Sequence, residues 1–146
     1  MTTKPLLSLA AFSVAFLAGT ATIAAAPIDP HHPLVGTWTV SIPGGRCIET
    51  YVIRADGTTL VTSADEVAES EFEVAPKPSK QGFYKWADRI VKDNGKKDCG
   101  GAITPVGRTI THHIRFSPDE DKFIICQEES LDACFGPFIR QEGDRV

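Results

Sequence analysis

The sequence predicts an all-β fold of about eight antiparallel strands, closed into a small up-and-down barrel, and three observations support this. After residue 26 the chain has 20 Ile and Val residues against three Leu, and β-branched residues favour strands. No long segment keeps the apolar period of an amphipathic helix. Instead, short runs alternate between apolar and polar residues, with Gly and Pro between them.

Four strands are predicted in the first half of the chain: Trp38–Ile42, Cys47–Arg54, Thr58–Ser63 and Ala68–Val74. The Asp56-Gly57 pair between the second and third is a strong hairpin signal, because glycine adopts the positive φ that the turn requires. Acidic residues in and before the fourth strand are expected to form a solvated outer stripe, made of Glu66, Glu69, Glu71 and Glu73. The alternative is a docking surface for a basic partner.

Four more strands are predicted in the second half: Gly82–Lys92, Thr109–Phe116, Lys122–Cys126 and Cys134–Arg140. The turn signal Asn94-Gly95 ends the first of these, and Ser117-Pro118-Asp119 ends the second. Sequential antiparallel strands must protect their edges by closing a barrel or by pairing two sheets.

The N-terminal 26 residues are expected to be a secretory signal peptide. They contain one charge, Lys4, then an apolar run, then the small residues Ala24-Ala25-Ala26. A transmembrane anchor is the alternative, but a span needs about 20 strongly apolar residues and this segment is rich in Ala, Ser and Thr. We therefore expect an exported protein, periplasmic or extracellular, with a flexible lead-in at 27–33 and one domain at 34–146.

Four cysteines in an exported chain favour two disulfides. Cys126 and Cys134 are separated by a short polar stretch, so we expect them to pair and to leave Cys47 for Cys99. A metal site is the competing interpretation, but there is no C-x-x-C and the four histidines have no ligand spacing to the cysteines. No metal and no cofactor are predicted.

The charge balance restricts the function classes. The net charge is −4 for 146 residues, and removal of the first 26 leaves 14 Lys and Arg against 19 Asp and Glu, a net charge of −5. This excludes a basic nucleic-acid binder of the usual kind. The length excludes a multidomain enzyme. The mature chain contains no second long apolar run, so no membrane span is predicted in it.

The Gly36-Thr37-Trp38 motif on the first strand, followed by about eight strands, resembles the lipocalin-like (calycin) barrels. That resemblance implies a tryptophan at the base of the barrel with an arginine of the last strand over its ring, here Trp38 and Arg140. The wider pattern resembles a family of small exported bacterial proteins of unknown function, with landmarks at Asp98-Cys99-Gly100 and Cys134-Phe135-Gly136-Pro137. The second resemblance implies no activity.

Residues for chemistry are few. No G-x-S-x-G motif is present, so no catalytic residue is assigned. Alternation places Tyr84 and Trp86 on one face, and together with His112 they are the candidate lining of an interior pocket. The alternative for His112 is a core histidine with one hydrogen bond, and His31-His32 is expected to be a solvated tail.

We therefore expect an exported binding protein without catalytic activity, holding a small apolar ligand. The alternative is a protein–protein module, such as a hydrolase inhibitor, an immunity protein or an envelope-stress factor, whose partner is an envelope protein. An enzyme is a third hypothesis. A barrel interior filled by side chains would remove the first hypothesis and leave the surface as the functional part.

Overall fold

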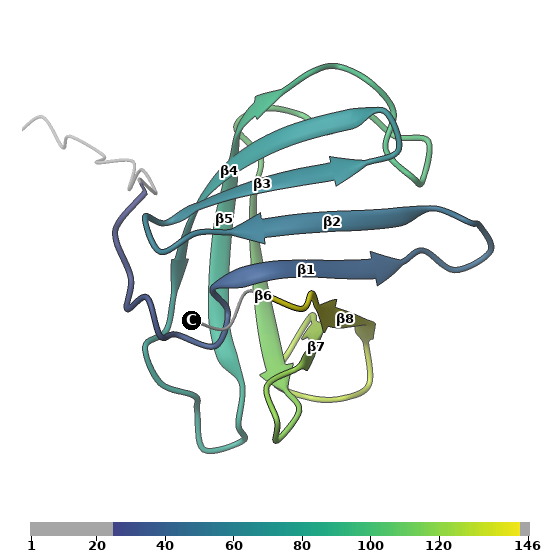
Figure 1. Ribbon diagram of the computed structural model, residues 1–146. Helices are drawn as coiled ribbons and strands as arrows, with labels where there is room; N and C mark the ends of the chain where they lie inside the picture. The colour runs from purple at the N-terminus through teal and green to yellow at the C-terminus, as the bar shows by residue number, and fades with distance from the viewer. Residues whose placement is uncertain (1–24, 144–146) are drawn as a thin grey trace, which may run out of the picture.

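The computed structural model describes residues 25–143, and these form eight strands (Figure 1). The strands are β1 (Gly36–Ser41), β2 (Ile48–Ile53), β3 (Thr58–Ser63), β4 (Glu66–Val74), β5 (Tyr84–Asp93), β6 (Thr109–Phe116), β7 (Lys122–Cys126) and β8 (Cys134–Arg140). The signal-peptide prediction falls almost entirely on residues 1–24, which lie outside the described residues. The described part of the chain contains no helix that could cross a membrane.

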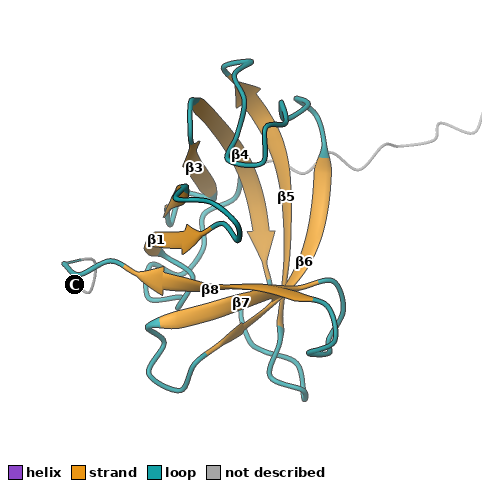
Figure 2. Ribbon diagram, turned by 90° about the vertical axis from the view of Figure 1, so that its right-hand side faces the viewer, coloured by secondary structure: helices purple, strands orange, loops and turns teal. Residues whose placement is uncertain are grey.

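Each strand pairs antiparallel with the next, and β8 returns to pair with β1, so the sheet is a closed barrel. Closure leaves no long unpaired edge among these strands. In Figure 2, β7 and β8 run at a steep angle to β5 and β6. The prediction of an all-β barrel of eight antiparallel strands is thus confirmed.

One end of the barrel is closed by a packed apolar core. The buried side chains there include Leu34, Trp38, Phe72, Phe123 and Phe138. Phe123 and Phe138 stack with their ring centroids 4.6 Å apart, and Trp38 packs edge-on against Phe123 at the same separation. Aromatic rings bury large apolar areas, so this cluster supplies much of the hydrophobic stabilisation of a small domain.

Arg140 lies across the tryptophan of this core. The two residues are paired in the β1–β8 register, and the Arg140 guanidinium carbon is 4.1 Å from the centre of the Trp38 ring. The guanidinium also donates to three backbone carbonyls, those of Pro33 (2.6 Å), Val35 (2.9 Å) and Glu120 (3.1 Å). The cation therefore joins the last strand, the segment just before the first strand and the β6–β7 turn.

The lead-in segment 27–33 differs from the flexible tail expected from the sequence, because it packs across the closed end. Ile28 N–H donates to the Ala55 carbonyl in the β2–β3 turn at 2.8 Å. His32 is buried, and its ring meets Tyr84 edge-on at 5.1 Å. Its Nε2 donates to the Ala75 carbonyl (3.1 Å), and its Nδ1 accepts from Leu34 N–H (3.1 Å). The packing of an aperiodic segment leaves no signal in an alternation pattern.

The opposite end is open and carries both disulfides. Cys47–Cys99 ties the β1–β2 loop to the β5–β6 connection, and Cys126–Cys134 joins the end of β7 to the start of β8. Both predicted pairings are therefore confirmed. Cross-links at this end hold the loops that surround the barrel mouth.

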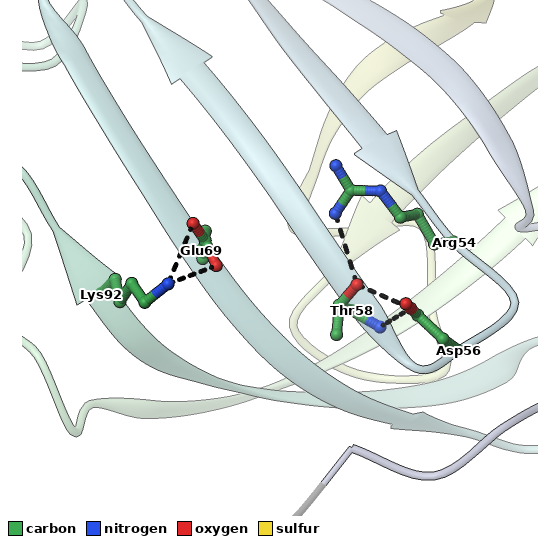
Figure 3. Close-up of polar contacts among 5 residues, drawn as sticks. All are labelled: Arg54, Asp56, Thr58, Glu69 and Lys92. Atoms are coloured by element: carbon green, nitrogen blue, oxygen red, sulfur yellow. Dashed lines mark hydrogen bonds and ion pairs between the residues drawn. The ribbon is translucent and has the colours of Figure 1, made fainter.

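The outer face of β4 does not present a free acidic stripe. Both carboxylate oxygens of Glu69 accept hydrogen bonds from Lys92 Nζ on β5, at 3.3 and 3.4 Å (Figure 3). Glu71 pairs with Arg89, also on β5, at 3.0 Å. Glu66, predicted to belong to the same outer stripe, is buried instead. Cross-strand pairing thus neutralises two of the four carboxylates.

Candidate functional site

The barrel encloses a cavity of about 760 Å³ between the apolar core and the open end. Every strand except β1 contributes lining residues, and the connections at the mouth add others. A volume of this size is within the usual range for small-molecule sites. The apolar part of the wall consists mainly of Val61, Ala68, Trp86, Ile90, Ile110, Ile125, Phe135 and Phe138.

Two of the three predicted lining residues reach this cavity. Trp86 and His112 face each other across β5 and β6, with ring centroids 5.5 Å apart, and both line the wall. Tyr84 does not line it: this ring packs against His32 and Phe116 at the closed end. Tyr84 points to the same face of β5 as Trp86, but it lies two residues closer to the closed end of the barrel, where the apolar core fills the interior.

The most unusual residue of the wall is Asp88, two positions after Trp86. Its Oδ1 lies 3.6 Å from Nε2 of His112 and has no hydrogen-bond partner among the described residues. Burial raises the pKa of Asp88 to about 6, although Ser70 and Arg108 act in the opposite direction. Burial also lowers the pKa of His112. At pH 7 the pair is therefore mainly a carboxylate beside a neutral imidazole.

Glu66 brings a second carboxylate into the lining from the start of β4. Glu66 is 4% exposed, and its Oε1 has no hydrogen-bond partner in the described part of the chain. Burial raises the pKa of Glu66, and the nearby Asp93 carboxyl adds to this effect. A register shift beside Glu69 and Ser70 places Asp93 opposite Ala68, on the interior side.

A third carboxylate, Glu49, is by contrast fully engaged. Its two oxygens accept from the Tyr51 hydroxyl (2.8 Å) and the Ser63 hydroxyl (2.6 Å). Ser63 Oγ in turn accepts from Cys99 N–H at 2.9 Å. This chain of hydrogen bonds connects the Cys47–Cys99 disulfide to the cavity wall, so Glu49 acts as a structural group of the mouth.

Four lining side chains have polar atoms that are buried and without a hydrogen-bond partner among residues 25–143. They are the Thr59 hydroxyl, one Glu66 oxygen, the Trp86 indole N–H and one Asp88 oxygen. Buried polar groups are nearly always paired in native proteins. Their concentration on one cavity wall indicates a site that accepts polar groups from a bound molecule or from water.

The sequence did contain a signal for the two carboxylates that were missed. Asp88 has the same strand parity as Trp86 and Ile90, and Glu66 has the parity of Ala68 and Ser70. Period-2 alternation therefore places both inside, and a charged residue on an apolar strand face is a candidate functional group.

Comparisons with protein-family models, with curated proteins and with solved structures found no match for this chain. Among residues 25–143, no group of three His, Cys, Asp or Glu side chains is arranged to hold a metal ion. The two cysteines of the cavity wall, Cys126 and Cys134, are bonded to each other. The fold and site therefore define a disulfide-braced, closed β-barrel whose interior cavity is lined by apolar and acidic side chains.

Proposed function

We propose that this chain is an exported, lipocalin-like barrel that binds a small molecule in its interior without catalysing a reaction. The observation that carries the proposal is the cavity of about 760 Å³ whose wall holds Trp86, Asp88 and His112. Two disulfides support an oxidising, extracytoplasmic location. The stacked Trp38–Arg140 pair supports the lipocalin-like resemblance.

The chemistry of the wall modifies the ligand expected from the sequence. A purely apolar molecule would leave the buried oxygens of Glu66 and Asp88 unpaired, and an unpaired buried polar group costs about 1–3 kcal/mol. The apolar surfaces of Ile90 and Ile110 nevertheless line the same space. We therefore propose an amphipathic ligand with both apolar and hydrogen-bonding groups.

A cavity-filling variant tests the proposal. Ala68 is 4% exposed and lines the cavity, so Ala68→Phe places a ring in the ligand space. Val67 is the adjacent residue, faces outward and is 44% exposed, so Val67→Phe is the matched control. In a thermal-shift screen of a small-molecule library, we expect compounds that raise the Tm of the wild type and of Val67→Phe but not of Ala68→Phe.

Two results of that screen would overturn the proposal. One is the absence of any compound that raises the wild-type Tm. The other is an equal response of Ala68→Phe, provided that its circular dichroism spectrum matches that of the wild type. Ala68→Leu serves as a milder filling variant if the larger ring prevents folding.

A protein–protein module is the second candidate, and the surface around the mouth favours it. Four apolar side chains there are more than half exposed: Ile48, Ile103, Val106 and Leu131. Leu131 lies in the loop tied by Cys126–Cys134, and a constrained loop loses little entropy on docking. Retention of the same envelope protein by the wild type, but not by Leu131→Ser, would support this function.

A further inference from the structure

The ionisable groups of the cavity wall are strongly biased to one sign. Five carboxylates line it, those of Glu49, Glu66, Asp88, Asp98 and Asp132, against one guanidinium, that of Arg108. Arg108 is exposed and lies in the connection before β6, at the mouth. An anionic ligand would therefore meet repulsion along most of the wall, whereas a cation is attracted by it.

On two of these carboxylates, one oxygen lacks the partner that an ionised oxygen requires. Asp88 Oδ1 and Glu66 Oε1 have no hydrogen-bond partner among the described residues, and the residues are 8% and 4% exposed. The imidazole beside Asp88 lies at 3.6 Å, beyond hydrogen-bond distance. A protonated amine has N–H donors and a positive charge, which satisfy both needs of such oxygens.

The aromatic and aliphatic parts of the wall suit the remainder of such a ligand. Trp86, the strongest cation–π acceptor among the side chains, precedes Asp88 by two residues on the same strand and lines the same cavity. Ile90 and Ile110 extend the wall with apolar surface. An ammonium group attached to an aromatic or aliphatic body matches this combination of groups.

We propose that the cavity binds an organic ammonium ion, held by the carboxylates of Asp88 and Glu66 and by the indole of Trp86. This inference rests on the proposed small-molecule function and names its ligand class. It assigns the buried carboxylates a purpose that packing does not supply, because an apolar side chain would fill the same wall without unpaired oxygens.

Three probes of similar size and different charge test the ligand class. They are 2-phenylethylamine, which is a cation at pH 7.5, 2-phenylethanol, which is neutral, and 3-phenylpropionate, which is an anion. Each is titrated calorimetrically into the purified protein at pH 7.5. We expect the amine to bind at least about tenfold more tightly than the alcohol, since hydrogen bonds to charged groups are the stronger ones, and the anion to bind most weakly.

Two variants locate the binding groups, and a third is their control. Asp88→Asn and Glu66→Gln each remove one interior charge, and each should weaken amine binding about tenfold while leaving alcohol binding unchanged. Glu69→Gln removes a carboxylate from the same strand as Glu66, but on the outer face where it pairs with Lys92 (Figure 3). This control variant should bind the amine as the wild type does.

The outcomes separate the two proposals. Equal or tighter binding of the alcohol or the anion overturns the ammonium assignment and leaves small-molecule binding intact. Amine binding that Asp88→Asn and Glu66→Gln leave unchanged also overturns the assignment, because the cation would then lie elsewhere. No binding of any of the three probes at millimolar concentration, together with a negative thermal-shift screen, overturns both proposals.

Discussion

Asp88 and His112 lie side by side inside the barrel, with 3.6 Å between the Asp88 Oδ1 and the His112 Nε2. Burial raises the pKa of Asp88 and lowers the pKa of His112. Near pH 7 the imidazole is therefore neutral and does not balance the negative charge of the carboxylate. A buried carboxylate with an unpaired oxygen, such as Oδ1 of Asp88, destabilises a fold, and natural cores avoid one unless it has a task. We interpret the pair as part of a binding wall.

Asp88→Asn should stabilise the protein in a pH-dependent way. The pKa of this acid rises from 3.8 to about 6 on folding, so its stabilising contribution is complete below pH 3.8 and is lost as the pH rises through 6. A shift of this size corresponds to about 3 kcal/mol as an upper estimate. The free energy of unfolding of the variant should therefore exceed that of the wild type at pH 7, and the difference should vanish near pH 3. Urea denaturation measures this, and the exposed Asp65→Asn is the control; a difference that does not change with pH would contradict the account.

His32→Gln should weaken the pH dependence of stability at the closed end. Burial lowers the pKa of His32 below 6.5, and both ring nitrogens are engaged in the neutral form. The neutral ring therefore stabilises the fold above pH 6.5, and this contribution decreases as the pH falls below that value. The variant should be less stable at pH 8 by about 1–2 kcal/mol, and the deficit should shrink toward pH 5. The neighbouring, exposed His31→Gln should follow the wild-type curve, and parallel curves for His32→Gln and the wild type would refute this role.

Arg140→Lys should destabilise the barrel although it keeps the charge. A lysine can neither lie flat on the Trp38 ring nor reach the three carbonyls that the guanidinium joins. We expect a loss of about 2 kcal/mol in the free energy of unfolding. Arg115→Lys is the control, because Arg115 is exposed and lies farther from its ring, 5.6 Å from the centre of Phe83. An equal effect of the two substitutions would show that the barrel-base pair has no special importance.

Removal of the two disulfides should have unequal effects. On the chain-entropy model, the Cys47–Cys99 bridge, with a sequence separation of 52, contributes about 4 kcal/mol, and Cys126–Cys134, with a separation of 8, about 2–3 kcal/mol. The double variant Cys47→Ala/Cys99→Ala should therefore lower the Tm more than Cys126→Ala/Cys134→Ala does. Calorimetry measures both Tm values. A larger loss of Tm in Cys126→Ala/Cys134→Ala than in Cys47→Ala/Cys99→Ala would contradict the entropic account.

Alternation and turn chemistry were sufficient to predict the strands. Runs such as the one that contains Ile110, His112 and Ile114 have the apolar period of two that is typical of strands. The turn residues Asp56-Gly57 directly mark the hairpin of β2 and β3. The need to protect the edges of eight short sequential strands predicts either a closed barrel or two paired sheets, and the resemblance at Gly36-Thr37-Trp38 favours the barrel. The disulfides follow from the even number of cysteines and their spacing.

The contents of the barrel were harder to predict. Parity shows which side chains point inward, but not how far along the axis the core ends and the cavity begins. It therefore predicts one site for Tyr84 and Trp86, although Tyr84 packs in the core and only Trp86 lines the cavity. The packing of His32 depends on the Ala75 carbonyl, which follows β4 and is 43 residues away in the sequence, so no local pattern encodes it. Glu66 precedes the predicted strand Ala68–Val74 and follows its acidic neighbours into the predicted outer stripe, whereas β4 begins at Glu66 and turns this side chain inward.

The two tryptophans provide the most direct test of the central claim, that an organic ammonium ion binds inside the barrel. The Trp38 indole N–H donates to the Leu34 carbonyl at 2.9 Å in the closed core, whereas the Trp86 indole N–H lines the cavity and has no partner among the described residues. We would follow both indole resonances by ¹⁵N NMR during titration with 2-phenylethylamine, assigned with Trp86→Phe. The account predicts that the Trp86 resonance shifts and saturates while that of Trp38 stays in place. A Trp86 resonance that does not move, or equal shifts of both, would contradict it.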